Sequence, residues 1–150
     1  MEIRDHKLVD TPFQESPNHG GVFPVGQADT IIIHYTAGSS GASSIRTLCD
    51  RNSKASAHIV VDKDGTITQL VPFNAIAWHA GRSSYDGRTG FNKYSIGIEI
   101  DNAGPLTRNG AEFTSWFGRR YPAEDVVEAI HRNQSTPAFW HRYEEEQITA

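Results

Sequence analysis

Hydrophobic residues along this chain gather in short runs that are separated by turn-forming residues. The run 30–35 (TIIIHY) carries β-branched residues on both faces, which predicts a central strand covered on each side. Segment 95–101 alternates strictly, with three isoleucines on one face and Gly97, Glu99 and Asp101 on the other. We therefore expect a second strand that holds the carboxylate of Glu99 on a rigid support.

Two further runs, 57–62 and 67–71, are rich in residues that favour strands and are joined through Asp64-Gly65. An Asp-Gly pair between two such runs is a strong local signal for a β-hairpin. Segment 39–52 opens with small polar residues that can cap a helix, and its apolar residues then follow helical spacing. The pattern predicts a short helix that covers the sheet.

The remaining segments are less regular. Residues 1–29 are rich in Pro, Gly, Asn and His, so we expect an irregular lead-in to a domain over 30–150. Segment 79–94 is a long loop of Gly, Ser, Arg and aromatic residues, which predicts one wall of a cleft. Segment 122–130 fits a helix or a strand, and 143–150 reads as the start of a helix.

Composition narrows the class of protein. With 150 residues and 37% hydrophobic residues, the chain suits one domain with one core. A formal net charge of -4 argues against nucleic acid as a partner, and the single cysteine excludes an internal disulfide. No apolar stretch approaches the roughly 18 residues of a membrane span, and the first ten residues lack a signal peptide's apolar region. We expect a monomer in the cytoplasm, with a cell-wall or phage-delivered location left open.

Candidate chemistry lies at four positions. His34 ends the first apolar strand, His58 lies in the next strand, His79 precedes the long loop, and Glu99 lies on the alternating strand. Singly, each has a common structural explanation, but one sheet would place all four together. A catalytic zinc needs about three protein ligands, and a carboxylate can carry the proton of an attacking water. Gly97 would leave room for substrate beside Glu99.

Four ordered motifs strengthen this interpretation. They are IIIHYTA at 31–37, SAHIVVDKDGT at 56–66, AWHAG at 77–81 and NKYSIGIEI at 92–100. In this order and at these separations the chain resembles the type 2 N-acetylmuramoyl-L-alanine amidase family. The resemblance covers roughly residues 30–102. It implies an α/β fold with a mixed central β-sheet flanked by helices, and a zinc ion in a surface groove.

The resemblance also implies a reaction and roles for residues. The reaction is hydrolysis of the amide between the lactyl group of muramic acid and L-alanine, in peptidoglycan or muropeptides. His34 matches the first zinc ligand, Glu99 the catalytic acid/base residue, and His79 a histidine that lines the substrate groove. His58 matches a histidine beside the site, for which a structural role and a site role both stay open.

The same resemblance implies zinc ligands that we do not find within the chain. In the family a His and then an Asp or Cys follow a helix that would begin near Tyr143, so we expect these ligands beyond Ala150. His131 and His141 have neighbours typical of loops, and we do not expect either to bind zinc. A chain without these ligands would be inactive alone. A noncatalytic peptidoglycan-binding module and an unrelated metal-dependent hydrolase are the alternatives.

Other polar and aromatic residues could contact substrate. Arg82 and Asn92 on the long loop, with Tyr85 and Arg88, are candidates for binding muropeptide, because carboxylates of a stem peptide favour arginine side chains. The pair Trp116-Phe117, beside Arg119-Arg120, could touch glycan or stem peptide. For this pair we favour the simpler interpretation, a satellite hydrophobic cluster under a surface loop.

Overall fold

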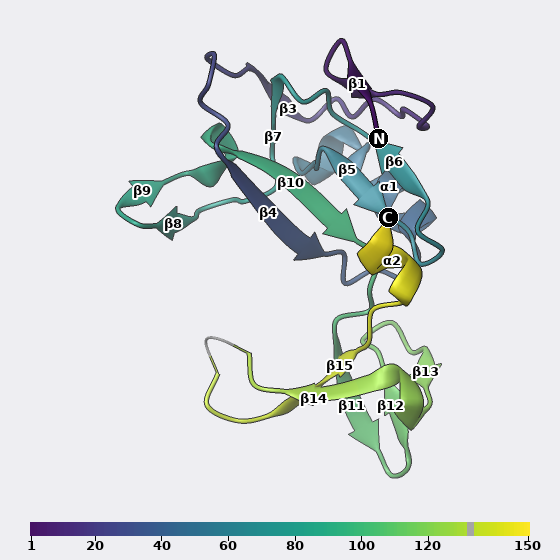
Figure 1. Ribbon diagram of the computed structural model, residues 1–150. Coiled ribbons are helices and arrows are strands. Elements are labelled where there is room, and N and C mark those ends of the chain that lie inside the picture. Colours follow the sequence, from purple (N-terminus) through teal and green to yellow (C-terminus); the bar gives the residue numbers. More distant parts are fainter. Residues whose placement is uncertain (132–133) are drawn as a thin grey trace.

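The computed structural model describes residues 1–131 and 134–150, and its centre is a mixed β-sheet (Figure 1). We call this the main sheet; its order is β4 (Thr30–Tyr35), β10 (Ser95–Ile100), β5 (Ile59–Val61) and β6 (Ile67–Gln69). Strand β10 pairs in parallel with β4 and β5, whereas β6 pairs antiparallel with β5. The predicted α/β fold with a mixed sheet is confirmed.

The predicted hairpin is also confirmed, because β5 and β6 are joined by a tight turn over residues 62–66. The amide of Asp62 donates to the carbonyl of Thr66 at 2.9 Å, and the carboxylate of Asp64 accepts from the Thr66 amide at 2.9 Å. Gly65 has a φ of 80°, a conformation that favours glycine. The Asp-Gly pair therefore sets the register of the two strands.

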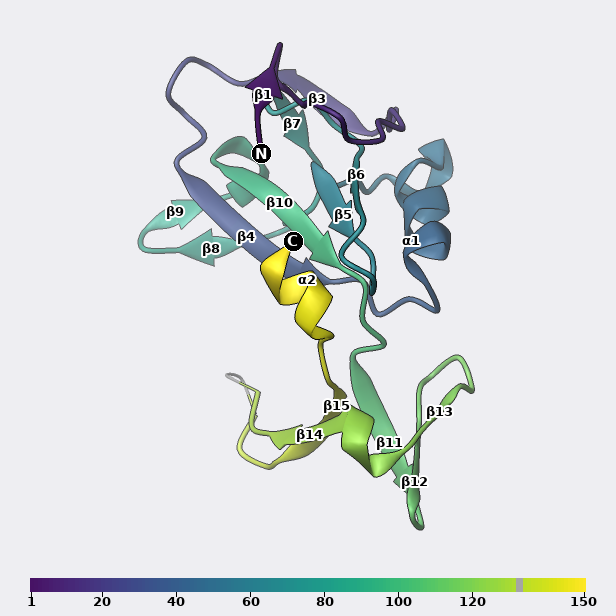
Figure 2. The ribbon, with the colours of Figure 1, turned by 45° about the vertical axis from the view of Figure 1, so that its right-hand side comes forward.

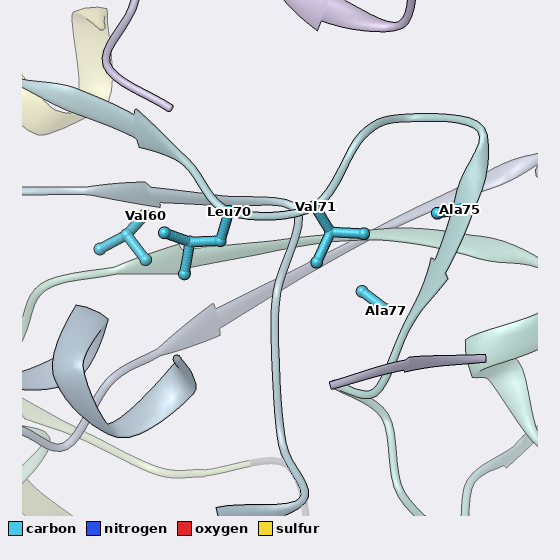
Figure 3. Packing of buried hydrophobic residues seen from close by; sticks show 5 residues of the cluster. All are labelled: Val60, Leu70, Val71, Ala75 and Ala77. Atoms are coloured by element: carbon cyan, nitrogen blue, oxygen red, sulfur yellow. The ribbon is translucent and has the colours of Figure 1, made fainter. Parts of the chain in front are cut away.

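Helix α1 (Gly41–Leu48) covers one face of this sheet, as predicted. Its first turn is capped by the Ser40 side chain, which accepts from the amide of Ser43 at 3.2 Å. A 3₁₀ turn, η1 (Arg51–Ser53), follows it. The helix packs its apolar residues on a buried cluster, five residues of which are shown in Figure 3: Val60, Leu70, Val71, Ala75 and Ala77.

The position predicted for segment 30–35 is wrong. Strand β4 lies at the edge of the main sheet, and Ile31 and Ile33 are each 64% exposed. The central place belongs to β10, which pairs with strands on both sides. A run of β-branched residues indicates an extended conformation, but it does not distinguish an edge strand from a central one.

The N-terminal segment 1–29 contains more structure than an irregular lead-in. It forms the short strands β1 (Ile3–Arg4), β2 (Lys7–Leu8) and β3 (His19–Val22), and β3 pairs with β7 (Ala75–Ala77). The buried side-chain amide of Asn18 donates to the backbone carbonyls of Asp50 at 2.8 Å and Ala55 at 2.9 Å. These contacts fix the segment against the main sheet's connections. A domain boundary at residue 29 stays a prediction.

A second sheet occupies residues 105–141 and was not predicted. Figures 1 and 2 show it beyond the carboxyl ends of β4 and β10. Its antiparallel order is β13 (Arg120–Tyr121), β12 (Glu112–Thr114), β11 (Pro105–Asn109), β15 (Ala138–His141) and β14 (Val126–Ala129). Segment 122–130, left open between helix and strand, is a 3₁₀ turn, η3 (Ala123–Asp125), followed by β14. His141 is buried in β15, so the loop-like setting expected for it is wrong.

The chain returns from the second sheet into helix α2 (Glu145–Thr149), which confirms the predicted helix start. Gln147 and Glu144 form a capping box, and the Gln147 side chain donates to the carbonyl of Asp101 at 2.8 Å. This contact ties α2 to the end of β10. Neither helix in the described residues has the length and apolar character needed to cross a bilayer.

Candidate active site

Glu99 and His34 come together because β4 and β10 run in parallel and in register. The two residues are paired across these strands, so their side chains emerge on the same face of the sheet. Both are partly buried. Burial raises the pKa of Glu99 to about 7 and lowers the pKa of His34. The pair therefore places a carboxyl group able to hold or release a proton near neutral pH beside an uncharged imidazole.

His79 is in direct contact with His34, and their hydrogen bond assigns the protons of both rings. His34 Nε2 lies 2.9 Å from His79 Nδ1, and His79 Nε2 lies 3.2 Å from the hydroxyl oxygen of Ser95. That hydroxyl donates to the carbonyl of Phe91 at 2.6 Å, so it accepts from His79 Nε2. A neutral His79 then accepts at Nδ1 from His34 Nε2. The lone pair left free on a neutral His34 is that of Nδ1.

The ring of His79 occupies the space beside Gly97. A Cβ at position 97 would overlap the imidazole of His79, so the glycine makes room for this histidine. The prediction that Gly97 leaves room for substrate is therefore wrong. Burial lowers the pKa of His79 to about 4, and the neighbouring His34 and His58 lower it further. His79 is consequently neutral at physiological pH.

The long loop over 79–94 positions His79 through Asn92. The Asn92 side-chain oxygen accepts from the amides of His79 at 3.0 Å and Ala80 at 2.7 Å. This finding gives Asn92 a positioning role; its contact with substrate stays a prediction. The loop also contains a small hairpin and a 3₁₀ turn: β8 (Ser84–Tyr85), β9 (Arg88–Thr89) and η2 (Phe91–Lys93).

The two arginines of this loop differ. Arg82 is exposed, and its role in binding substrate stays a prediction. Arg88 forms an ion pair with Asp29 at 2.9 Å and lies over the rings of Phe91 and Tyr94. The contacts of Arg88 fasten the loop to the start of β4. Arg88 therefore serves the loop's conformation, a function that its sequence context did not indicate.

The structure resolves the alternatives for His58 in favour of a structural role. The side chain is fully buried, with Nε2 2.9 Å from the carbonyl of Ala75 and Nδ1 accepting from the amide of Gly97 at 3.0 Å. Burial lowers its pKa to about 4. Both ring nitrogens are thus used by the backbone, and His58 joins β7 to β10.

The described residues do not by themselves fit a zinc site. A catalytic zinc has three protein ligands as well as its water. Within residues 1–131 and 134–150, no group of three or more His, Cys, Asp or Glu side chains could hold a metal ion. The His34 and His79 nitrogens that face each other are joined by a hydrogen bond. His34 as a zinc ligand stays a prediction.

A cavity of about 380 Å³ lies beside Glu99, and its lining includes the Trp116-Phe117 pair that the sequence offered as a possible substrate contact. Its lining includes Tyr35 and Thr36 after His34, and Trp116 and Phe117 from the second sheet. Phe117 also packs on the core of that sheet, as a satellite cluster would. Trp116 does not: it is 75% exposed, so the prediction was wrong for this residue. Trp116 lies in a tight turn before Gly118, where the sequence has no periodic pattern of apolar residues. The absence of that pattern was the sequence feature that could have predicted its exposure.

Comparison with known proteins finds relatives of this chain by sequence. The family model described as N-acetylmuramoyl-L-alanine amidase matches residues 24–150. The AmpD protein of Citrobacter freundii, named as a 1,6-anhydro-N-acetylmuramyl-L-alanine amidase, is 43% identical over 76 residues, which cover 47% of this chain and 41% of AmpD. The amidase AmiD of Escherichia coli is 38% identical over 94 residues, which cover 58% of this chain and 33% of AmiD. The chain thus spans less than half the length of these relatives.

A solved structure extends the match to most of the chain. The complex of E. coli AmiD with anhydro-N-acetylmuramic acid-L-Ala-D-gamma-Glu-L-Lys superposes with a TM-score of 0.57 at 30% identity. The superposition covers 85% of this chain and 40% of that structure. Together with the family model, which matches well over half of the residues, it decides the classification: the chain belongs to the N-acetylmuramoyl-L-alanine amidase family.

Proposed function

We propose that this protein hydrolyses the amide between the lactyl group of muramic acid and L-alanine in peptidoglycan or muropeptides. The observation that carries the proposal is Glu99, a partly buried carboxyl group with a pKa of about 7 that lines a cavity next to His34. The names of the relatives support the substrate class, since AmpD and AmiD are both muramyl-L-alanine amidases.

Glu99 suits the role of general base and then general acid. As a base it accepts a proton from the water that attacks the amide carbonyl carbon; as an acid it returns the proton to the leaving nitrogen. The C–N bond breaks, and the products are the lactyl carboxylate and the free amine of L-alanine. A pKa of about 7 keeps both forms of the carboxyl group populated near neutral pH. A fully exposed glutamate would hold the proton poorly at this pH.

His34 and His79 would act on the same face of the main sheet as Glu99. His79 fixes the ring of His34 through the hydrogen bond to Nε2, and Asn92 and Ser95 fix His79 in turn. This arrangement leaves Nδ1 of His34 free to bind a partner in front of the sheet. His79, Arg82 and Asn92 remain our proposed substrate-binding residues.

Zinc is our proposed cofactor, with His34 as one ligand. The described residues do not supply the other ligands that a zinc site needs. Metal content is the direct test. We expect the purified natural protein to contain about one zinc per chain by mass spectrometry, and the His34→Ala variant to lose most of it. An equal zinc content in both proteins would remove His34 from the ligand set.

The activity test is Glu99→Gln, which keeps the size of the side chain and removes its ionisation. Release of free L-alanyl peptide from a muropeptide, followed by chromatography, should fall at least about 100-fold, while muropeptide binding persists. Glu128→Gln, at an exposed strand position of the second sheet, is the matched control and should keep full turnover. Undiminished turnover by Glu99→Gln would contradict the mechanism. Muropeptide binding with no turnover by the unmodified protein would instead support the noncatalytic binding module.

A further inference from the structure

The cavity beside Glu99 has two walls that come from different parts of the fold. One wall is the connection from β4 into α1 together with the first turn of α1, where Ser39 and Ser43 carry hydroxyl groups. The other wall is the turn between β12 and β13 of the second sheet, which contributes Trp116 and Phe117. Its volume of about 380 Å³ falls within the range of small-molecule sites. The second sheet is therefore part of the candidate active site.

Trp116 is held in a fixed orientation although most of its surface is open to solvent. Its indole N–H donates to the carbonyl of Ala37 at 2.7 Å, which reaches across to the opposite wall. The ring of Phe117 stands nearly perpendicular to it, with centroids 5.6 Å apart and an interplanar angle of 88°. The polar edge of the indole is satisfied, so its exposed surface is left for an apolar contact.

The charge of the residues that line the cavity indicates which part of a muropeptide the cavity can bind. Glu99 is the one ionisable acid in the described lining, which contains no Lys, Arg or His. The stem peptide carries carboxylates, which such a lining would repel and could not pair. A pyranose ring is neutral, with C–H bonds on its faces and hydroxyl groups around its rim. Hydroxyl side chains on one wall and a fixed indole on the other complement both features.

We propose that this cavity binds a neutral pyranose ring of the substrate's glycan, and that Trp116 is its specificity-determining residue. The identity of the ligand rests on the proposed function, but binding does not depend on turnover. The amide to be cleaved would then lie at the Glu99 end of the cavity, with the peptide extending away from Trp116.

The test is binding of N-acetylglucosamine, the neutral ring on which muramic acid is built, compared with the tripeptide L-Ala-D-γ-Glu-L-Lys. Saturation-transfer NMR on the full protein should show contacts at the ring protons of the sugar. We expect Trp116→Ala to weaken sugar binding about tenfold and Trp116→Phe to keep it within about threefold, because phenylalanine retains an aromatic face. Ile130→Ala, which removes an exposed apolar side chain elsewhere in the same region, is the control and should bind sugar normally.

Three results would overturn the assignment. They are absence of sugar binding, sugar binding that is unchanged in both Trp116 variants, and tripeptide binding that depends on Trp116. Trp116 is 75% exposed, so its substitution leaves no core void, and Trp116→Leu, which also lacks an aromatic face, gives the same test of sugar binding if Trp116→Ala fails to fold. Sugar binding that requires Trp116 in a protein without amidase turnover would refute the proposed function and leave this inference standing. Turnover with no sugar binding would do the reverse.

Discussion

The main sheet and the second sheet bury hydrophobic side chains to different depths. In the main sheet Leu70 and Val71 are fully buried, and α1 adds a further layer. In the second sheet Leu106 and Phe113 keep 7% and 8% of their surface exposed, and the side chains packed on their cluster, Phe117, Val126 and Phe139, come from the same sheet and its turns. The main sheet and α1 thus form two layers with a core between them. The second sheet packs largely on its own aromatic side chains.

This difference matches what each region contributes to the site. The main sheet carries Glu99 and His34, whose relative position is fixed by strand pairing. The second sheet contributes Trp116 from a turn, and this residue reaches the other wall through one hydrogen bond to Ala37. The residues of the proposed chemistry therefore lie on the sheet that α1 covers, and the wall that we propose selects the ligand lies on the second sheet.

A matched pair of leucine substitutions gives the largest expected effect. Leu70→Ala should lower the free energy of unfolding by about 3 to 5 kcal/mol, and Leu106→Ala by about 2 to 3 kcal/mol, because Leu70 is fully buried whereas Leu106 keeps 7% of its surface exposed. Urea denaturation measures both. In hydrogen exchange, Leu106→Ala should deprotect the amides of the second sheet and spare those of β5 and β10. Equal deprotection of both sheets would show that they unfold as one unit.

Each region also contains a buried histidine, and the two make the free energy of unfolding depend on pH. Burial lowers the pKa of His58 and of His141 to about 4; near His141, Lys63 and Arg119 lower it further while Asp125 raises it. The unfolded state, with a pKa of about 6.5, binds protons that the folded state excludes. Stability is therefore lost as pH falls from about 6.5 through 4, by roughly 3 kcal/mol for His58 and by less for His141, whose ring is less deeply enclosed.

The check on this prediction separates the two histidines. NMR titration of the imidazole C–H resonances should show both rings neutral down to about pH 5, and a ring that titrates near 6.5 would contradict its burial. His141→Asn keeps an acceptor for the Ala103 amide and removes the titration. Urea denaturation at pH 7 and pH 4.5 should show a smaller difference for this variant than for the unmodified protein.

The sequence predicted the main sheet better than the second, and the reason is physical. Strict alternation at 95–101 and the Asp64-Gly65 turn are local patterns, and local patterns specify strands and hairpins directly. The second sheet is built from strands of two to five residues, too short for a period to emerge. Its pairing of β11 with β15 joins residues more than thirty positions apart, which no local pattern records.

In the candidate site, too, the sequence indicated some features and not others. The motifs indicated His34 and Glu99, and strand register brings these two residues together. The use of Gly97 as space for the His79 ring was hidden, because it depends on where a side chain from another segment lies. The exposure of Trp116 was hidden for the same reason, since it follows from the placement of the second sheet against the connection after β4.

The junction between the regions supplies a prediction of intermediate size. The buried side chain of Asn102 donates to the carbonyls of His141 at 3.1 Å and Arg142 at 3.3 Å, and accepts from the amide of Gly104 at 2.8 Å. Asn102→Ala would leave these groups without partners, so we expect a loss of about 2 kcal/mol in urea denaturation. Asn109→Ala, at an exposed position, is the control and should cost under about 0.5 kcal/mol. Equal losses would show that Asn102 does not join the two sheets.

The smallest effect concerns the hydrogen bond that crosses the cavity. Trp116→Phe removes the indole donor to Ala37, and since this side chain is exposed we expect a loss of only about 0.5 to 1 kcal/mol. Asn109→Ala removes an exposed hydrogen bond to the Thr114 hydroxyl, which lies within the second sheet. Both variants should therefore lose little stability, but only Trp116→Phe should shift the amide resonances around Ala37 in the main region. A shift of those resonances by both variants, or by neither, would mean that the cavity wall is held by something other than this bond.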